Sequence, residues 1–283
     1  MYKRQSSTYA GLSAGPVLGG FLNHNFGWKS IFIAAAIVSA VAFYGAFRKL
    51  PAENRTKDKS HMDWRGVFLY ITAIVGLMYG FSTLTASDAG PFILAAGAIL
   101  MFLFIRTELK QENPVIEVRM FGQNLSYAFS NLAALLNYGA TYAISYLISI
   151  YLQTVMDYNS QTAGLILIAS PLVMAVLSPV AGRLSDKHSP YIMSSAGMGF
   201  CAAALALFSF LPQESSIFRI IGTLSLSGIG FALFTSPNTN AVMASVEKED
   251  YGIASSILAT MRSIGHTASM AVVTLVMLSL IHI

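Results

Sequence analysis

Long apolar segments constrain this chain more than any other feature. A transmembrane helix needs about 20 mostly apolar residues, and the sequence contains nine stretches of roughly that length. Only 11% of the residues are charged, whereas a soluble domain carries about 25%. No strand pattern competes over such lengths. We therefore predict an all-α, polytopic membrane helix bundle. Its nine predicted transmembrane helices cover residues 6–22, 28–48, 64–85, 91–107, 125–153, 161–182, 190–211, 217–245 and 252–277.

The basic residues predict how the chain is oriented in the membrane. Two of the 17 lie in the N-terminal Tyr2–Gln5 stretch, and 12 of the other 15 fall together on one side of the nine segments. Lys29 and Arg219 lie on the opposite side, and Arg262 lies within a segment. Basic residues gather in cytoplasmic loops, so we expect that side to face the cytoplasm of a plasma membrane or cell inner membrane. The 12 residues are Arg48, Lys49, Arg55, Lys57, Lys59, Arg65, Arg106, Lys110, Arg119, Arg183, Lys187 and Lys248.

A glycine pattern marks the first apolar segment. Gly11, Gly15 and Gly19 are spaced four residues apart, so they share one helical face, and Gly20 extends the run. A face without side chains lets a second membrane helix approach closely. Pro16 removes a backbone donor and bends a helix. An ordinary packing seam remains the alternative to a functional motif.

This pattern resembles the antiporter signature in the fifth helix of major facilitator superfamily exporters, G-x8-G-x3-G-P-x2-G-G. Gly11, Gly15, Pro16, Gly19 and Gly20 match its last five fixed positions, and Tyr2 replaces the first glycine. Later motifs resemble the fourteen-helix drug:proton antiporter branch of the superfamily in the same order. These motifs are Gly27-Trp28, Asp63-Trp64-Arg65-Gly66, Tyr151-Leu152-Gln153, Ala163-Gly164-Leu165, Pro171, Pro179, Gly228, Gly230, Pro237, Arg262 and Gly265.

The resemblance implies a fragment with a particular division. Residues 1–49 would end the N-terminal half, 50–124 would hold cytoplasmic loops and two inserted linker helices, and 125–283 would form five of the six C-terminal helices. Family helices one to four and fourteen would be absent. The stretches Tyr2–Gln5 and Leu278–Ile283 match peptides that a transposase-library sequencing adaptor can encode, so we assign no function to residues 1–5 and 278–283.

A short loop resembles a second facilitator signature, G-x-L-a-D-r-x-G-r-r. Gly182, Arg183, Asp186 and Lys187 fall in this loop, where Arg183 occupies the variable second position and the later glycine and basic run are missing. Asp186 lies just before the start of a helix, where a carboxylate is favourable. The loop is either a charge latch that breaks when the two halves rock or a basic turn that sets topology.

Arg262 and His266 lie four residues apart on one face of the last segment. An ionisable residue inside a membrane helix is a functional-site hypothesis by default. Arg262 either lines a cavity or extends its long side chain to the membrane surface. Histidine changes charge near neutral pH, so His266 either carries a proton or packs as a neutral ring.

Polar and aromatic residues gather in two further segments and are candidates for a substrate cavity. A helix broken by a proline such as Pro237 frees carbonyl groups that a cavity or a neighbour must satisfy. Aromatic walls suit lipophilic cations, although ordinary packing also explains such residues. The candidates are Asn137, Tyr138, Tyr142, Tyr146, Phe231, Phe234 and Asn238, together with Arg262 and His266.

Several absences shape the predicted function. The sequence holds no P-loop for ATP, no metal-ligand spacing and no nucleophile with a base nearby in sequence, so we expect no catalytic residue, metal or cofactor. The net charge of +4 comes from basic residues placed as membrane orientation requires, so we expect no nucleic-acid partner. The acidic residues lie in loops or at helix ends. The resemblance implies secondary active efflux of small lipophilic or cationic compounds, coupled to protons. An importer, a specific-metabolite exporter, a channel or a membrane receptor are the alternatives.

Overall fold

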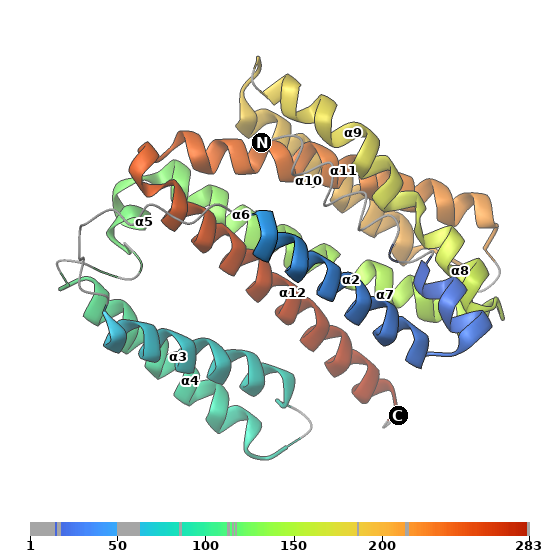
Figure 1. The fold of residues 1–283 in the computed structure, drawn as a ribbon, viewed down its shortest axis with the longest axis horizontal. Helices are drawn as coiled ribbons and strands as arrows, with labels where there is room; N and C mark the ends of the chain where they lie inside the picture. The colour runs from blue at the N-terminus through green and yellow to red at the C-terminus, as the bar shows by residue number, and fades with distance from the viewer. Residues whose placement is uncertain are drawn as a thin grey trace. The chain divides into compact units, whose positions relative to one another are not determined.

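A computed structural model describes residue 15 and residues 18–49, 63–84, 87–111, 114, 116, 118–185, 187–212 and 215–281. All regular structure in these residues is helical (Figure 1). The described residues belong to two compact units. Unit 1 takes its residues from 1–59, 147–180 and 199–232, and unit 2 takes its residues from 60–146, 181–198 and 233–283.

The helices follow the predicted segments closely. The predicted segment 125–153 is built from three consecutive pieces, and the segment 161–182 from two. In chain order the elements are α2 (Lys29–Lys49), α3 (Trp64–Ser82), α4 (Gly90–Glu108), α5 (Arg119–Gln123), α6 (Leu125–Thr141), α7 (Ala143–Ile150), the π-helix η1 (Tyr151–Val155), α8 (Ser160–Leu167), α9 (Ala169–Ser185), α10 (Pro190–Ser209), α11 (Ile217–Ala244), the 3-10 helix η2 (Lys248–Asp250) and α12 (Tyr251–Ile281).

The prediction of nine transmembrane helices is not confirmed. Within the described residues, seven helical stretches are long and apolar enough to cross a membrane. The predicted segment 6–22 lies largely outside the described residues. The predicted segment 252–277 appears as α12, which is helical but is not among the seven. The prediction of an all-α, multi-spanning chain is confirmed.

Side-chain caps and one glycine explain several helix ends. The Asp63 carboxylate accepts hydrogen bonds from two N–H groups at the start of α3, and Asn124 and Asn159 cap α6 and α8 in the same way. The helix over residues 18–26 ends at Gly27, whose φ of 76° is a left-handed conformation that favours glycine.

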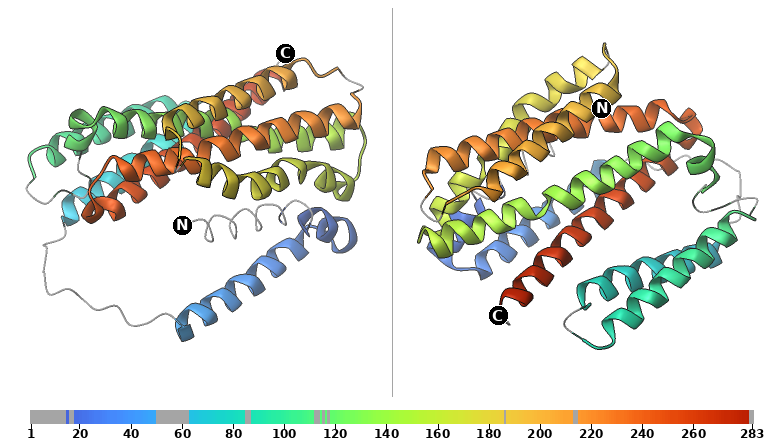
Figure 2. Two further views of the ribbon diagram at one scale, coloured as in Figure 1. Left: turned by 90° about the horizontal axis from the view of Figure 1, so that it is seen from above. Right: turned by 180° about the vertical axis from the view of Figure 1, so that it is seen from behind.

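In unit 2, α3 and α4 form a close antiparallel pair (Figures 1 and 2). Their backbones meet at glycines: a Cβ atom added to Gly97 would lie 2.5 Å from the backbone nitrogen of Leu77. Tyr70 packs against Phe104 within the pair, with ring centroids 5.1 Å apart. The Tyr70 hydroxyl also donates a 3.1 Å hydrogen bond to Thr260, which connects α3 to α12.

The core of unit 2 lies where α6, α11 and α12 pack together. Its buried side chains include Tyr127 from α6, Phe234 and Val242 from α11, and Ile257 from α12. α6 and α12 lie side by side over much of their length (Figure 2, right). This packing places the polar residues of three helices next to one another.

In unit 1, α9 and α11 meet at small residues. A Cβ atom at Gly228 of α11 would lie 2.5 Å from the carbonyl oxygen of Ser170 in α9, so the two backbones approach closely. The Ser170 and Ser227 hydroxyls share a buried hydrogen bond of 3.1 Å. Tyr151 of η1 donates a hydrogen bond to the carbonyl of Pro212.

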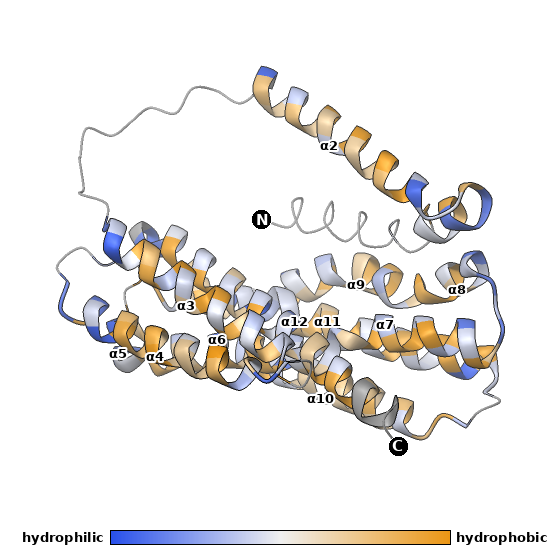
Figure 3. Ribbon diagram, turned by 90° about the horizontal axis from the view of Figure 1, so that it is seen from below, coloured by the Kyte–Doolittle hydropathy of each residue, from blue (hydrophilic) through white to orange (hydrophobic). Residues whose placement is uncertain are grey.

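The helices expose large apolar side chains along their length. Figure 3 shows that hydrophobic residues recur along α2, α3 and α4. In α2, for example, Phe43 is 74% exposed and Phe47 is 81% exposed. Such continuous apolar surface is unfavourable in water and favourable in a bilayer.

Candidate functional site

The candidate site lies at the crossing of α6 and α12 in unit 2, which two glycines make possible. A Cβ atom at Gly265 would lie 2.7 Å from the carbonyl oxygen of Leu135 and 3.0 Å from the backbone nitrogen of Gly139. Gly265 is buried and the two backbones are therefore in direct contact. Because the helices are this close, large side chains beside the crossing and one turn away from it contact the facing helix.

Four of these side chains form a cation–aromatic cluster: Tyr138, Tyr142, Arg262 and His266. The Arg262 guanidinium carbon lies 5.0 Å from the centre of the Tyr138 ring, which is a cation–π contact. The His266 ring meets Tyr138 edge-on, with centroids 5.1 Å apart, and stacks on Tyr142, with centroids 4.0 Å apart and planes 20° apart. The structure thus brings together four residues that the sequence placed on two separate segments.

A break in the helix positions Tyr142. α6 ends at Thr141 and α7 begins at Ala143, so the helical hydrogen bonding is interrupted at Tyr142. The backbone N–H of Ala143 donates instead to the hydroxyl of Ser269 on α12, at 3.1 Å. Both residues are buried, so this bond satisfies a donor that would otherwise be stranded. Ser269 thereby fixes the break beside the cluster.

α11 contributes the neighbouring wall of the cluster. The Tyr138 and Thr235 hydroxyls lie 3.4 Å apart, and the Tyr138 and Phe234 rings meet edge-on with centroids 6.4 Å apart. Phe234 is fully buried. Tyr138 is therefore in contact with α11 and α12 at once, and its ring holds the guanidinium of Arg262 on one side.

Arg262 gives the cluster its charge. Its Nε atom is buried and has no hydrogen-bond partner, and Arg262 forms no ion pair with the residues that the structure describes. A guanidinium offers five donors in a planar fork that matches carboxylates and similar acceptor groups. Within the same described residues, no group of three or more His, Cys, Asp or Glu residues could hold a metal ion. The cluster can bind acceptor groups and aromatic rings.

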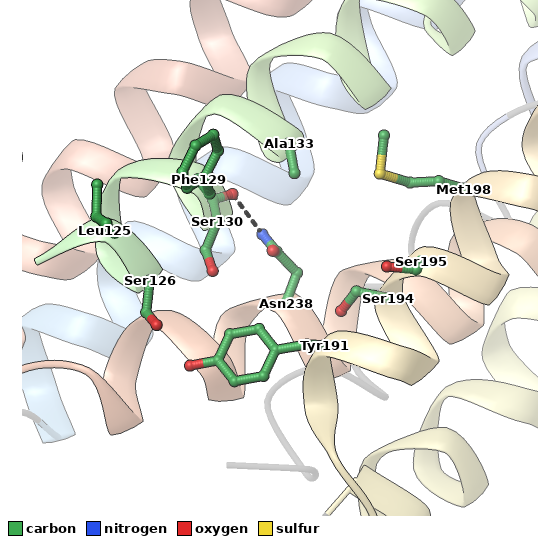
Figure 4. A pocket seen from close by; sticks show the side chains of 10 residues that line it. All are labelled: Leu125, Ser126, Phe129, Ser130, Ala133, Tyr191, Ser194, Ser195, Met198 and Asn238. Carbon is green, nitrogen blue, oxygen red and sulfur yellow. Dashed lines mark hydrogen bonds between the residues drawn. The ribbon is translucent and has the colours of Figure 1, made fainter.

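A separate cavity of about 350 Å³ lies between α6, α10 and α11 in unit 2 (Figure 4). Hydroxyl groups from Ser130, Ser194 and Ser195 and the amide of Asn238 line it, together with apolar side chains. Asn238, one of the predicted cavity residues, donates a 3.1 Å hydrogen bond to the carbonyl of Ser130. The cavity carries no charged side chain among the described residues that line it, so it suits a neutral group.

Two other predicted cavity residues of unit 2 do not join the cluster. Asn137 is 3% exposed and packs inside unit 2, where its Oδ1 atom has no hydrogen-bond partner among the described residues. Tyr146 of α7 is exposed and makes no ring contact with the cluster. The remaining predicted cavity residue, Phe231, belongs to unit 1.

The glycine motif of the first segment is only partly described. Gly11 and Pro16 lie outside the described residues. A Cβ atom added to Gly15 or Gly19 would meet no described atom within 4 Å, whereas a Cβ atom at Gly20 would lie 2.6 Å from the carbonyl oxygen of Ser160. Gly20 alone of these described glycines thus contacts another helix.

The predicted charge latch is also partly described. Asp186 lies outside the described residues, Arg183 and Lys187 are exposed, and Gly182 is buried. The neighbouring Ser185 hydroxyl donates to the carbonyl of Gly182 and accepts a 2.7 Å hydrogen bond from the Asn240 amide of α11. The start of the loop is therefore anchored to α11.

The sequence reasoning missed Gly139 and Ser269. Gly139 was overlooked because its partner Gly265 is 126 residues away, and a four-residue spacing rule detects only glycines on one helix. Ser269 belongs to a serine- and threonine-rich stretch, and nothing in that stretch distinguishes the hydroxyl that caps a distant helix break.

The chain is similar to a family of known proteins. Residues 4–270 match the family model described as Major Facilitator Superfamily. The riboflavin transporter RibZ of Clostridioides difficile (strain 630) is 28% identical over 257 residues, which are 90% of this chain and 55% of that protein. The multidrug resistance protein Stp of Mycobacterium tuberculosis (strain CDC 1551 / Oshkosh) is 29% identical over 272 residues, 93% of this chain and 49% of Stp. The drug efflux pump JefA of the same strain is 24% identical over 261 residues, 90% of this chain and 51% of JefA.

The chain spans about half the length of the curated relatives it matches. The family match covers nearly all of the chain, and the apolar helices make it a multi-pass membrane protein. These findings agree on one assignment: the chain belongs to the major facilitator superfamily, a family of membrane transporters.

Proposed function

We propose that the protein acts in secondary active efflux of small lipophilic compounds across the plasma membrane, coupled to proton entry. The family and its named relatives support transport, and relatives such as Stp and JefA are named for drug resistance and drug efflux. Transport would occur by alternating access, in which two halves of a facilitator rock around a central binding site.

The observation that carries this proposal is the cation–aromatic cluster. A charged side chain within a membrane protein is costly and is usually retained for function. Here Arg262 contacts the ring of Tyr138, which in turn meets His266, and His266 stacks on Tyr142, in a unit whose other described helices are largely apolar. Rings and hydrogen-bond donors together form the kind of surface that binds small aromatic molecules.

The more detailed assignments belong to the same proposal. The chain would be part of a fourteen-helix antiporter, with α3 and α4 as the inserted pair between the halves. The glycine motif that ends at Gly20 would seal one side of the central site. The loop from Gly182 to Lys187 would act as a charge latch. The contacts of Gly20 with Ser160 and of Ser185 with Asn240 are consistent with these roles.

A specific-metabolite transporter is the second candidate. The relative RibZ is named as a riboflavin transporter and is about as similar to this chain as Stp is. Riboflavin is planar and rich in acceptor groups, which suits the donors of Arg262 and the rings around it. A dedicated transporter would move one such compound and reject unrelated drugs.

Efflux from cells tests the proposal directly. Cells that express the gene from which this chain derives would be loaded with Nile red, a neutral lipophilic dye, and separately with riboflavin, and the loss of each compound would be followed by fluorescence. We expect efflux that a protonophore abolishes. Efflux that continues after the proton gradient collapses would contradict proton coupling, and efflux of riboflavin alone would favour the second candidate.

A further inference from the structure

We propose that the cation–aromatic cluster selects planar aromatic substrates that carry a carboxylate or a similar anionic acceptor group, and that it disfavours lipophilic cations. This inference rests on the proposed transport function and narrows its substrate class. The aromatic rings alone would suit a positively charged substrate. The positive charge of Arg262 reverses this preference in favour of a negatively charged one.

The charge balance around Arg262 is the first step. Its Nε atom is buried without an acceptor, and no carboxylate in the described part of the chain forms an ion pair with it. His266, one turn along α12, adds a further ring nitrogen and no negative charge. The cluster therefore has hydrogen-bond donors and positive charge but lacks an anionic acceptor from the described residues. A cation placed beside it would be repelled, and an anion would supply the missing partner.

The orientation of the guanidinium is the second step. Tyr138 holds the Arg262 side chain by its cation–π contact, and Tyr138 is itself held by Thr235 and Phe234. Because the guanidinium is held in place, binding an anion would cost less ordering of the side chain. A carboxylate can accept two parallel hydrogen bonds from such a planar fork.

The aromatic surface is the third step. Tyr142 stacks on His266, and Tyr142 is 45% exposed, so part of its ring remains accessible. A planar ring could lie against Tyr142 while its acceptor group reaches Arg262, because Tyr138 and Tyr142 lie one turn apart on the same helix face. The surface that would bind the ring of a substrate thus lies next to the guanidinium that would bind its anionic group.

Matched probes test the charge preference. The 283-residue chain would be reconstituted in phosphatidylcholine nanodiscs. Binding of three anthracenes of similar size would be measured by fluorescence anisotropy: 9-anthracenecarboxylate, neutral 9-anthracenemethanol and cationic 9-(aminomethyl)anthracene. Empty nanodiscs would correct for partitioning into lipid. We expect the carboxylate to bind at least about tenfold more tightly than the amine, since hydrogen bonds to charged groups are the strong ones.

Three variants locate the preference. Arg262→Gln should weaken carboxylate binding by roughly 10–100-fold and leave the neutral probe nearly unchanged. Arg262→Lys keeps the charge but loses the planar fork, so it should lose only part of the affinity. Arg219→Gln removes an exposed arginine of unit 1, which donates a hydrogen bond to the carbonyl of Phe210, and as a matched control it should leave the binding of all three probes unchanged.

The inference is overturned if the amine binds as tightly as the carboxylate, if no probe binds, or if Arg262→Gln leaves carboxylate binding unchanged. An unchanged value would mean that a carboxylate from another part of the protein already occupies Arg262. If Arg262→Gln fails to fold, as judged by circular dichroism, the wild-type comparison of the three probes still decides. Proton-dependent efflux without a charge preference would refute only this inference, whereas a charge preference without proton-dependent efflux would refute only the proposed function.

Discussion

The crossing of α6 and α12 makes a sharp prediction about two glycines that lie within a few ångströms of each other. Gly265→Ala would place a methyl group 2.7 Å from the carbonyl oxygen of Leu135, 3.0 Å from the backbone nitrogen of Gly139 and 3.1 Å from Cβ of Tyr138. Gly139→Ala would place its methyl group 3.7 Å from the nearest atom, the carbonyl oxygen of Gly265, which is an ordinary contact. The same chemical change should therefore have different effects on the two sides of one crossing.

The difference can be estimated from these distances. Relief of the closest contact at position 265, from 2.7 Å to an ordinary 3.4 Å, needs a shift of 0.7 Å by backbone atoms that cannot rotate away. Overpacking of this kind costs about 1–3 kcal/mol. Alanine also stabilises a helix relative to glycine by about 0.5–1 kcal/mol, but both variants share that gain. Gly265→Ala should therefore be about 1–3 kcal/mol less stable than Gly139→Ala.

Thermal unfolding in detergent, followed by circular dichroism, measures this difference. One kcal/mol shifts the melting temperature of a protein of 150–250 residues by about 2–4 °C, so the two variants should differ by roughly 2–12 °C. Gly265→Ala should also weaken binding of 9-anthracenecarboxylate, since the shift separates Tyr138 from Arg262. If the two variants have the same melting temperature, or if Gly139→Ala is the less stable, the inference that the two backbones are in direct contact at this crossing is wrong.

Three further changes test other contacts. Gly97→Ala should lower the free energy of unfolding by about 1–3 kcal/mol in chemical denaturation, because its Cβ would lie 2.5 Å from a backbone nitrogen of α3. Ser269→Ala should cost about 1–3 kcal/mol in thermal unfolding, because the buried Ala143 N–H loses its acceptor, and Ser269→Thr should restore most of that loss. Asn240→Ala removes a 2.7 Å hydrogen bond to Ser185 and should cost about 0.5–1.5 kcal/mol. Asn240→Ala should also speed tryptic cleavage at Lys187, in the loop that follows Ser185. An unchanged cleavage rate would contradict the interpretation that the Asn240–Ser185 hydrogen bond anchors this loop to α11.

The helices could be predicted from the sequence because apolar length is a local property. The segments 64–85 and 91–107 appear as α3 and α4 with ends shifted by at most three residues. The predicted segment 252–277 likewise appears as a helix, α12, although α12 is not among the seven stretches of the described residues that are long and apolar enough to cross a membrane.

The site could be predicted only in its parts. Tyr138 and Tyr142 on one segment and Arg262 and His266 on another are each predicted as cavity residues from their spacing. Helical periodicity shows which residues share a face, but it does not show which two faces meet. The break at Tyr142 was not predictable for the same reason, since the hydroxyl that stabilises it comes from Ser269 on another helix.

The smallest residues of this unit therefore determine what its largest residues can do. Gly139 and Gly265 bring α6 and α12 to backbone contact, and this short separation is what allows Tyr138 to reach Arg262 and His266. A larger residue at the crossing would move the rings away from the guanidinium and leave a partly buried cation without a π-face, its buried Nε atom still without an acceptor. Packing at the crossing and charge recognition in the cluster should accordingly fail together in Gly265→Ala, whereas Arg262→Gln should abolish charge recognition and leave the crossing intact.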